Sequence, residues 1–190
     1  MSNETWQGTR ITESGVEFAV WAPGARAVEL EFINDEGPWY VSLDRQENGV
    51  WTADVAEAAA GTRYKYRVDG GYPCPDPRSR FQPDGVHGPS EVVDPGAYGW
   101  TDQAWPGIQA ENQVFYELHV GTYTGDGTFA ALERELAELK RLGITAIELM
   151  PIAQSPGERN WGYDGVDLFA PSSIYGRPDD LRSLVDAAHR

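Results

Sequence analysis

The spacing of apolar residues along the chain differs before and after residue 114, and this difference limits the fold more than any other feature. In the first third, apolar side chains alternate with polar ones, as at Val16, Phe18 and Val20. From residue 114, short apolar runs alternate with segments in which apolar residues recur every three to four positions. The first pattern is typical of antiparallel sheets and the second of βαβ units. We therefore expect a multidomain β plus α/β fold.

Residues 1–69 predict an immunoglobulin-like β-sandwich. Alternating runs occupy residues 16–22, 28–32, 39–43, 51–55 and 63–68. Turn residues such as Asn48-Gly49 separate them, and short strands at about ten-residue spacing are typical of a sandwich. The single cysteine, Cys74, excludes a disulfide framework within the chain.

Residues 70–113 break both patterns and predict an ordered connection between the domains. They hold seven of the 13 prolines, at positions 73, 75, 77, 83, 89, 95 and 106. Loops longer than about 15 residues are uncommon in compact domains unless they connect or function. Aromatic residues such as Phe81, Trp100 and Trp105 distinguish this stretch from a flexible Gly/Ser linker.

Residues 114–190 predict the first two βα units of an incomplete (β/α)8 barrel. We expect strands at 114–120 and 144–150, and a loop from there to about residue 177. Thr128 is placed to cap a first helix that ends at Gly143, and Pro178 to begin a second. The expected core stripes are Phe129, Leu132, Leu136, Leu139 and Leu142 in the first helix, and Leu181, Leu184, Val185 and Ala188 in the second. A closed barrel needs about 200 residues or more, so two strands leave an open edge that predicts self-association.

The charge of the chain excludes two classes of partner. Fifteen Lys and Arg stand against 30 Asp and Glu, which gives a net charge of −15. Nucleic acids and anionic membranes would repel such a surface. No apolar run approaches the roughly 20 residues of a membrane span, and the first residues lack a secretory pattern. We therefore expect a cytoplasmic protein with no nucleic-acid or membrane partner.

Two motifs suggest chemistry but have simpler explanations. Gly125-Asp-Gly127-Thr-Phe-Ala130 matches a dinucleotide-binding fingerprint, with Glu148 23 residues after the first glycine. Four residues separate Gly125 from the preceding strand, which favours an ordinary helix-entry turn. Glu117 and Glu148, one on each strand, could form the carboxylate pair of a glycosidase. Burial with a backbone or arginine partner is the favoured explanation.

The histidines predict no metal site. His87, His119 and His189 are far apart in sequence and lack the short spacing of metal ligands. We interpret His119 as a hydrogen-bonded core residue and Cys74 as inert.

The segment 158–165 is the most site-like part of the chain. Trp161 and Tyr163 flank a glycine, with Asn160 and Asp164 beside them. Aromatic faces next to polar groups suit a sugar ring, and loops after barrel strands form the active face. Packing of the aromatics onto the barrel is an equal alternative.

Four segments resemble the α-amylase family of glycoside hydrolases, and within it the malto-oligosyltrehalose trehalohydrolases. They are residues 76–94 (DPRSRFQPDGVHGPSEVVD), 115–123 (FYELHVGTY), 143–151 (GITAIELMP) and 160–165 (NWGYDG). The resemblance implies cleavage of the α-1,4 bond next to the terminal trehalose of malto-oligosyltrehalose, without a cofactor. It implies that Tyr163 stacks on the sugar and that Asn160, Trp161 and Asp164 line the same pocket.

The resemblance assigns no catalytic residue to this chain. The family's Asp nucleophile and Glu acid/base match no position here, so we expect the 190 residues to be inactive alone. An alternative is an α-glucan-binding module without catalysis. Its candidate ligand-binding tryptophans are Trp6, Trp21, Trp39 and Trp51, although the core is the favoured location for the last three.

Overall fold

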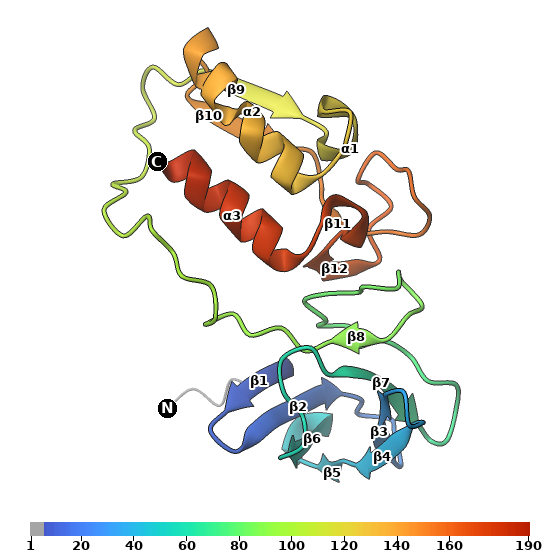
Figure 1. Cartoon of the computed structure of the whole chain (residues 1–190). Coiled ribbons are helices and arrows are strands. Elements are labelled where there is room, and N and C mark those ends of the chain that lie inside the picture. Colours follow the sequence, from blue (N-terminus) through green and yellow to red (C-terminus); the bar gives the residue numbers. More distant parts are fainter. Residues whose placement is uncertain (1–5) are drawn as a thin grey trace.

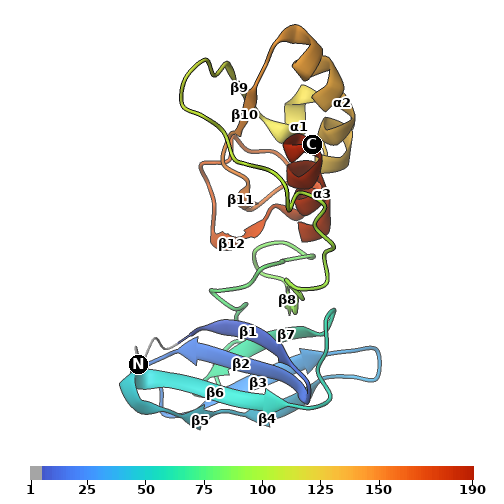
Figure 2. The same ribbon diagram turned by 90° about the vertical axis from the view of Figure 1, so that its left-hand side faces the viewer.

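Two bodies of different class follow one another along the chain (Figures 1 and 2). The computed structural model describes residues 6–190. The first body is a sandwich of two antiparallel sheets, and the second combines two parallel strands with two long helices. The expected fold class, a β-sandwich followed by two βα units, is therefore confirmed.

The sandwich consists of two four-stranded sheets. One has the order β1 (Gly8–Thr12), β2 (Gly15–Trp21), β6 (Val50–Val55) and β5 (Asp44–Arg45). The other has the order β4 (Trp39–Ser42), β3 (Val28–Ile33), β7 (Arg63–Val68) and β8 (Ser90–Glu91). A 3-10 turn, η1 (Glu47–Gly49), joins β5 to β6. All strand pairs are antiparallel, as the alternating pattern predicts.

Three aromatic rings fill the space between the two sheets. Val16, Phe18 and Val20, the predicted inner face of β2, are all buried. Phe18 contacts Phe32 and Tyr64 of the facing sheet edge-to-face, with ring centroids 5.5 and 4.9 Å apart. Large aromatic side chains contribute much buried apolar surface, so the small domain has a core without a disulfide.

The strand tryptophans divide between core and surface. Trp51 is buried, and its indole nitrogen donates to the carbonyl of Ala22 over 3.0 Å. Trp39 stacks on Phe32 with ring centroids 4.0 Å apart. Trp21 is 58% exposed, so its expected place in the core is wrong. It occupies the last position of β2, where its indole donates to the carbonyl of Asn48.

The first part of the connection lies against the sandwich. Cys74 pairs with Tyr66 of β7 through two backbone hydrogen bonds of 2.8 Å. Asp76 is buried; its carboxylate accepts from the Tyr64 hydroxyl at 2.6 Å and from the Arg78 amide at 2.7 Å. The Asp76 amide in turn donates to Ser90 Oγ at 2.9 Å. The domain boundaries at 69 and 113 stay predictions.

The second part of the connection lies against the last helix, α3 (Pro178–His189). Thr101 donates to the carboxylate of Asp186 from its amide (2.8 Å) and its hydroxyl (2.6 Å). The Asp102 carboxylate lies 2.6 Å from Nδ1 of His189, and Trp105 stacks on the same imidazole at 3.5 Å. Side chains thus hold this segment to the helix along the path seen in Figure 2.

The α/β body contains the two predicted strands and both predicted helices. Its elements are β9 (Phe115–Leu118), α1 (Val120–Tyr123), α2 (Phe129–Leu142), β10 (Ala146–Leu149), β11 (Ala153–Gln154), β12 (Asp167–Pro171), η2 (Ser173–Tyr175) and α3. β9 and β10 are parallel, whereas β11 and β12 form an antiparallel pair within the expected long loop. Among residues 6–190, no helix is both long enough and apolar enough to cross a bilayer.

The helix ends follow the predicted capping residues. Thr128 Oγ1 accepts from the amide of Ala131 at 3.2 Å, and Gly143 is left-handed with φ 98°. The core stripes are shorter than expected: Leu142 is 70% exposed and Ala188 is exposed. Both lie in the last turn of their helix.

The first strand is also shorter than expected. We expect residues 114–120 to be extended, but β9 ends at Leu118, because Val120 begins the one-turn helix α1. Val120 keeps its predicted burial inside this turn. Apolar content alone does not distinguish a buried strand end from a buried helical turn.

Burial of Asp76 makes the stability of the sandwich depend on pH. Desolvation raises the pKa of the Asp76 carboxyl to about 6, although the Tyr64 hydrogen bond opposes the shift. An acid with a raised folded-state pKa binds more protons when folded, so the free energy of unfolding falls as pH rises from about 4 to about 6. Between pH 4.5 and pH 7 this decrease in the free energy of unfolding is of the order of 2 kcal/mol. We expect Asp76→Asn to remove it.

Urea unfolding at pH 4.5 and pH 7 measures this difference. The exposed Asp54, on β6, provides the matched control, Asp54→Asn, which should behave as the unchanged chain does. An equal pH dependence in Asp76→Asn and the unchanged chain would show that Asp76 does not carry it.

Candidate functional site

The four predicted sugar-binding residues lie on the loop between β11 and β12 (Figure 1). Trp161 is 73% exposed and Tyr163 is 71% exposed. Asp164 is also exposed, whereas Asn160 is half-buried. The structure thus brings all four onto one short segment and leaves both aromatic rings open to solvent. Within the described residues neither ring is buried against the α/β body, and packing onto the barrel stays an alternative interpretation.

Gly162 fixes the path of the loop between the two aromatic residues. Its φ is 91°, and a Cβ added here would lie 2.0 Å from the carbonyl oxygen of Pro151. No side chain fits at this distance, and the left-handed backbone favours glycine as well. Gly162 is therefore in close backbone contact with Pro151, which follows β10, and Trp161 and Tyr163 lie on either side of this contact.

Asn160 stabilises the same turn with its side chain. Its Oδ1 accepts from the Gly162 amide at 2.5 Å, and its Nδ2 donates to Ser155 Oγ. An asparagine that bonds to the backbone two residues ahead is typical of a tight turn. Both ends of the Asn160 amide are thus engaged within the loop, which favours a positioning role over direct sugar contact.

His119, which directly follows β9, holds the loop through a hydrogen bond to its backbone. Its Nε2 lies 2.7 Å from the carbonyl oxygen of Asn160, and the Tyr175 hydroxyl is 3.3 Å from the same nitrogen. Its ring meets Trp161 edge-on at 6.3 Å. The expectation of a hydrogen-bonded histidine is confirmed, but at the candidate site and not in a remote core.

Sequence reasoning missed Tyr175 and Ser155 as parts of this site. Tyr175 is buried in η2, and its ring also packs edge-on against Phe129 at 5.7 Å. Burial raises the pKa of the Tyr175 hydroxyl, so it stays a neutral hydrogen-bonding group. No local pattern marks either residue, because η2 and the loop meet only through the fold.

The two strand glutamates lie outside this loop. Glu117 and Glu148 are directly opposite each other in the parallel pair, and both are exposed. The expected burial with a backbone or arginine partner is therefore wrong. They occupy the face of the sheet opposite to Tyr116 and Ile147, which pack toward the helices.

The glycine-rich segment before α2 is explained by packing. α1 separates β9 from Gly125, so the tight strand-to-helix turn of a dinucleotide site is absent between them. A Cβ on Gly127 would lie 2.9 Å from the carbonyl oxygen of Gly121. Gly127 thus permits close approach of two chain segments, and the helix-entry interpretation stands.

No metal centre accompanies the loop. Within residues 6–190, no group of three or more His, Cys, Asp or Glu side chains is arranged to hold a metal ion. The exposed groups of the loop that remain available to a ligand include two aromatic rings, the carboxylates of Glu158 and Asp164, and the guanidinium of Arg159. This combination suits a neutral polyhydroxylated ring better than an anion.

Comparison with known families divides the chain at the same region as the structure. Residues 5–95 match carbohydrate-binding module 48, the isoamylase N-terminal domain. Residues 105–190 match the α-amylase catalytic domain. The second match covers β9, β10 and the candidate loop, and it overturns the dinucleotide-binding alternative for that region.

Individual relatives agree with both matches. The chain is 45% identical over 96% of its length to malto-oligosyltrehalose trehalohydrolase of Saccharolobus solfataricus, and 47% identical over 93% to that of Deinococcus radiodurans. It spans only 32% and 28% of those two proteins.

A solved structure shows the same arrangement of elements. The crystal structure of a Salmonella typhimurium protein described as an α-amylase aligns with a TM-score of 0.89. That protein is 44% identical, and the alignment covers 96% of this chain and 31% of that one. The chain therefore consists of a carbohydrate-binding module 48 domain followed by the start of an α-amylase catalytic domain.

Proposed function

We propose that this chain is the N-terminal region of a hydrolase that cleaves the α-1,4-glucosidic bond next to the terminal trehalose of malto-oligosyltrehalose. One observation carries this proposal: the relatives that match 93–96% of the chain at 45–47% identity bear the name of that enzyme. Its role in the reaction is to bind the glucan near the loop 160–164. Its proposed compartment is the cytoplasm, in keeping with a single cysteine and no disulfide framework.

The geometry of the loop supports glucan binding. Trp161 and Tyr163 offer exposed aromatic faces, and the Gly162–Pro151 contact fixes their spacing. A preorganised aromatic surface binds at lower entropic cost than one that must be ordered by the ligand. Asp164 adds an acceptor for sugar hydroxyls, whereas Asn160 stabilises the turn.

A second candidate function is glucan binding by the sandwich itself. Trp21, 58% exposed at the end of β2, is the strand tryptophan that the sandwich leaves open to a ligand. The match of residues 5–95 to a carbohydrate-binding module supports this alternative. The two functions place the ligand on different bodies of the molecule, so single substitutions separate them.

Trp161→Ala and Tyr163→Ala are expected to weaken binding of a malto-oligosaccharide such as maltoheptaose. Each aromatic face contributes about 1 kcal/mol, which corresponds to about a fivefold rise in Kd. Calorimetric or NMR titration measures the effect, and Trp21→Ala is the matched control. A loss of affinity in Trp21→Ala alone would transfer the binding site to the sandwich.

The chain alone is expected to release no trehalose from malto-oligosyltrehalose. Glu117 and Glu148 are exposed on the strand face, and we propose that the nucleophile and acid/base belong to a part of the enzyme outside these 190 residues. Product analysis after prolonged incubation checks this. Trehalose release that Glu117→Gln abolishes would contradict the proposal and make the glutamate pair catalytic.

Self-association is expected through the α/β body. Among residues 6–190, β9 and β10 pair only with each other, and the first residue of β9, Phe115, is 60% exposed. Sedimentation velocity should show a concentration-dependent dimer or larger species, reduced by Phe115→Lys. A monomer at all concentrations, with strong amide protection of both strands, would contradict this.

A further inference from the structure

We propose that the chain also binds a phosphorylated small sugar, in a groove that begins at the N-terminal edge of the sandwich and reaches the α/β body. Two cavities of about 360 and 300 Å³ adjoin here and share Gln7 and Arg80. The first lies against β1, and the second lies between the connection, β12 and the start of α3. Neither contains a residue of the candidate glucan loop, so this proposal does not depend on the function proposed above.

The charge of the groove is opposite to that of the chain. Its lining includes four arginines and a single carboxylate: Arg10, Arg78, Arg80, Arg182 and Asp94. The whole chain carries 15 basic and 30 acidic side chains. A local excess of guanidinium groups attracts a small anion, whereas the acidic surface elsewhere on the chain repels it.

Two of these arginines have no carboxylate partner within residues 6–190. Arg10 pairs with Glu17 and Arg182 with Asp179, whereas neither Arg78 nor Arg80 has an acidic group within 4.0 Å in the described part of the chain. The guanidinium of Arg78 lies 4.3 Å from the ring centre of Phe169, which orients it at the groove. Guanidinium forks match the oxygen atoms of a phosphate and bind them more strongly than neutral donors do.

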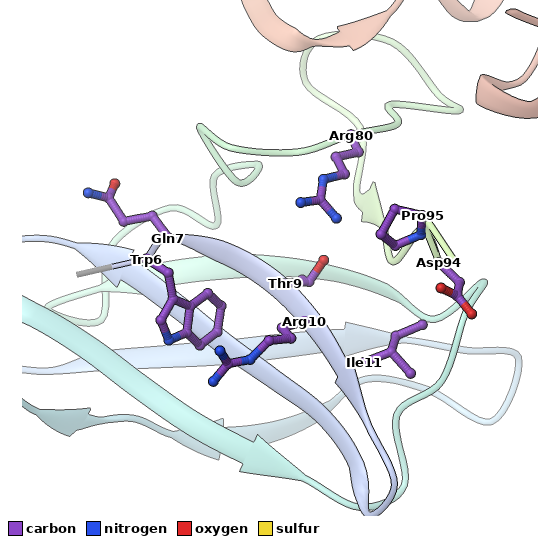
Figure 3. Close-up of a pocket in the computed structure, with 8 residues that line it drawn as sticks. All are labelled: Trp6, Gln7, Thr9, Arg10, Ile11, Arg80, Asp94 and Pro95. Carbon is purple, nitrogen blue, oxygen red and sulfur yellow. The ribbon is translucent and has the colours of Figure 1, made fainter. Parts of the chain in front are cut away.

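The first cavity also has an apolar wall, which suits a ring attached to the phosphate. Figure 3 shows Arg80 extending from the connection toward β1, with Trp6 and Arg10 on the facing side and Asp94 at one end. Arg10 lies over the Trp6 ring at 4.6 Å and is held there by Glu17. A sugar face can pack against Trp6 while Asp94 accepts from its hydroxyls.

Compensation of the buried Asp76 is the simpler role for Arg78 and Arg80, since both lower the pKa of that carboxyl. Asp76, however, obtains its hydrogen bonds from Tyr64 and the Arg78 backbone. Arg80 is exposed and lines both cavities. A purely compensating arginine would affect stability and would leave anion binding unchanged.

Titration calorimetry with three probes tests the proposal: glucose 6-phosphate, inorganic phosphate and glucose. Glucose 6-phosphate should bind with a Kd below about 1 mM, inorganic phosphate about tenfold more weakly, and glucose not at all in the same range. Added salt should weaken binding, because the attraction is largely electrostatic.

Variants assign the binding to the groove. Arg80→Gln should raise the Kd for glucose 6-phosphate at least about fivefold. Trp6→Leu should remove only the advantage of the sugar phosphate over inorganic phosphate. Arg26→Gln is the matched control, because it removes the same charge from a side chain that is 87% exposed and outside the groove.

Three results would overturn the proposal. The first is no binding of glucose 6-phosphate at about 10 mM. The second is an equal effect of Arg80→Gln and Arg26→Gln, which would mean attraction by general charge. The third is binding of inorganic phosphate as tight as that of glucose 6-phosphate, which would exclude recognition of the sugar. Unfolding temperatures of all variants show whether a loss reflects the fold.

Discussion

The buried carboxylate of Asp76 lies where the sandwich passes into the connection, and it holds the two together. It accepts from Tyr64 of β7, and its own amide donates to Ser90 of β8, so it fixes the start of the connection on the second sheet. Beyond this point several side chains of the connection contact the α/β body. Arg177 pairs with Glu91, and Arg78 lies over Phe169. A carboxylate desolvated at this position is costly, and its hydrogen bonds offset the cost only if the connection keeps one path.

The candidate glucan site likewise depends on contacts that hold one segment, the loop 160–164, in a single path. Gly162 approaches the Pro151 carbonyl more closely than any side chain would permit, and His119 lies 2.7 Å from the Asn160 carbonyl. The loop is thus held by the residues that follow β9 and β10. Rigid support of exposed aromatic rings is what a sugar-binding surface requires, because flexible rings lose affinity through ordering.

The sequence predicts the elements well and their environments less well. Period-2 alternation and the caps Thr128 and Gly143 suffice to place the sandwich strands and α2, because these signals are local. The exposure of Trp21 and Glu117 is not predictable in this way, since it depends on which edge or face the fold leaves uncovered. The aromatic pair of the loop is visible in the sequence, whereas its support by Tyr175 is not, because η2 approaches from a distant segment.

The proposed role of the loop 160–164 is to bind an α-glucan on an aromatic surface that the fold holds in place. Hydrogen–deuterium exchange of the chain with and without malto-oligosyltrehalose tests it most directly, since the loop amides report the ligand without any substitution. We predict slower exchange at residues 158–166 and no change across β1 and β6. Unchanged exchange in the loop at saturating ligand, or protection confined to the sandwich, would contradict the account.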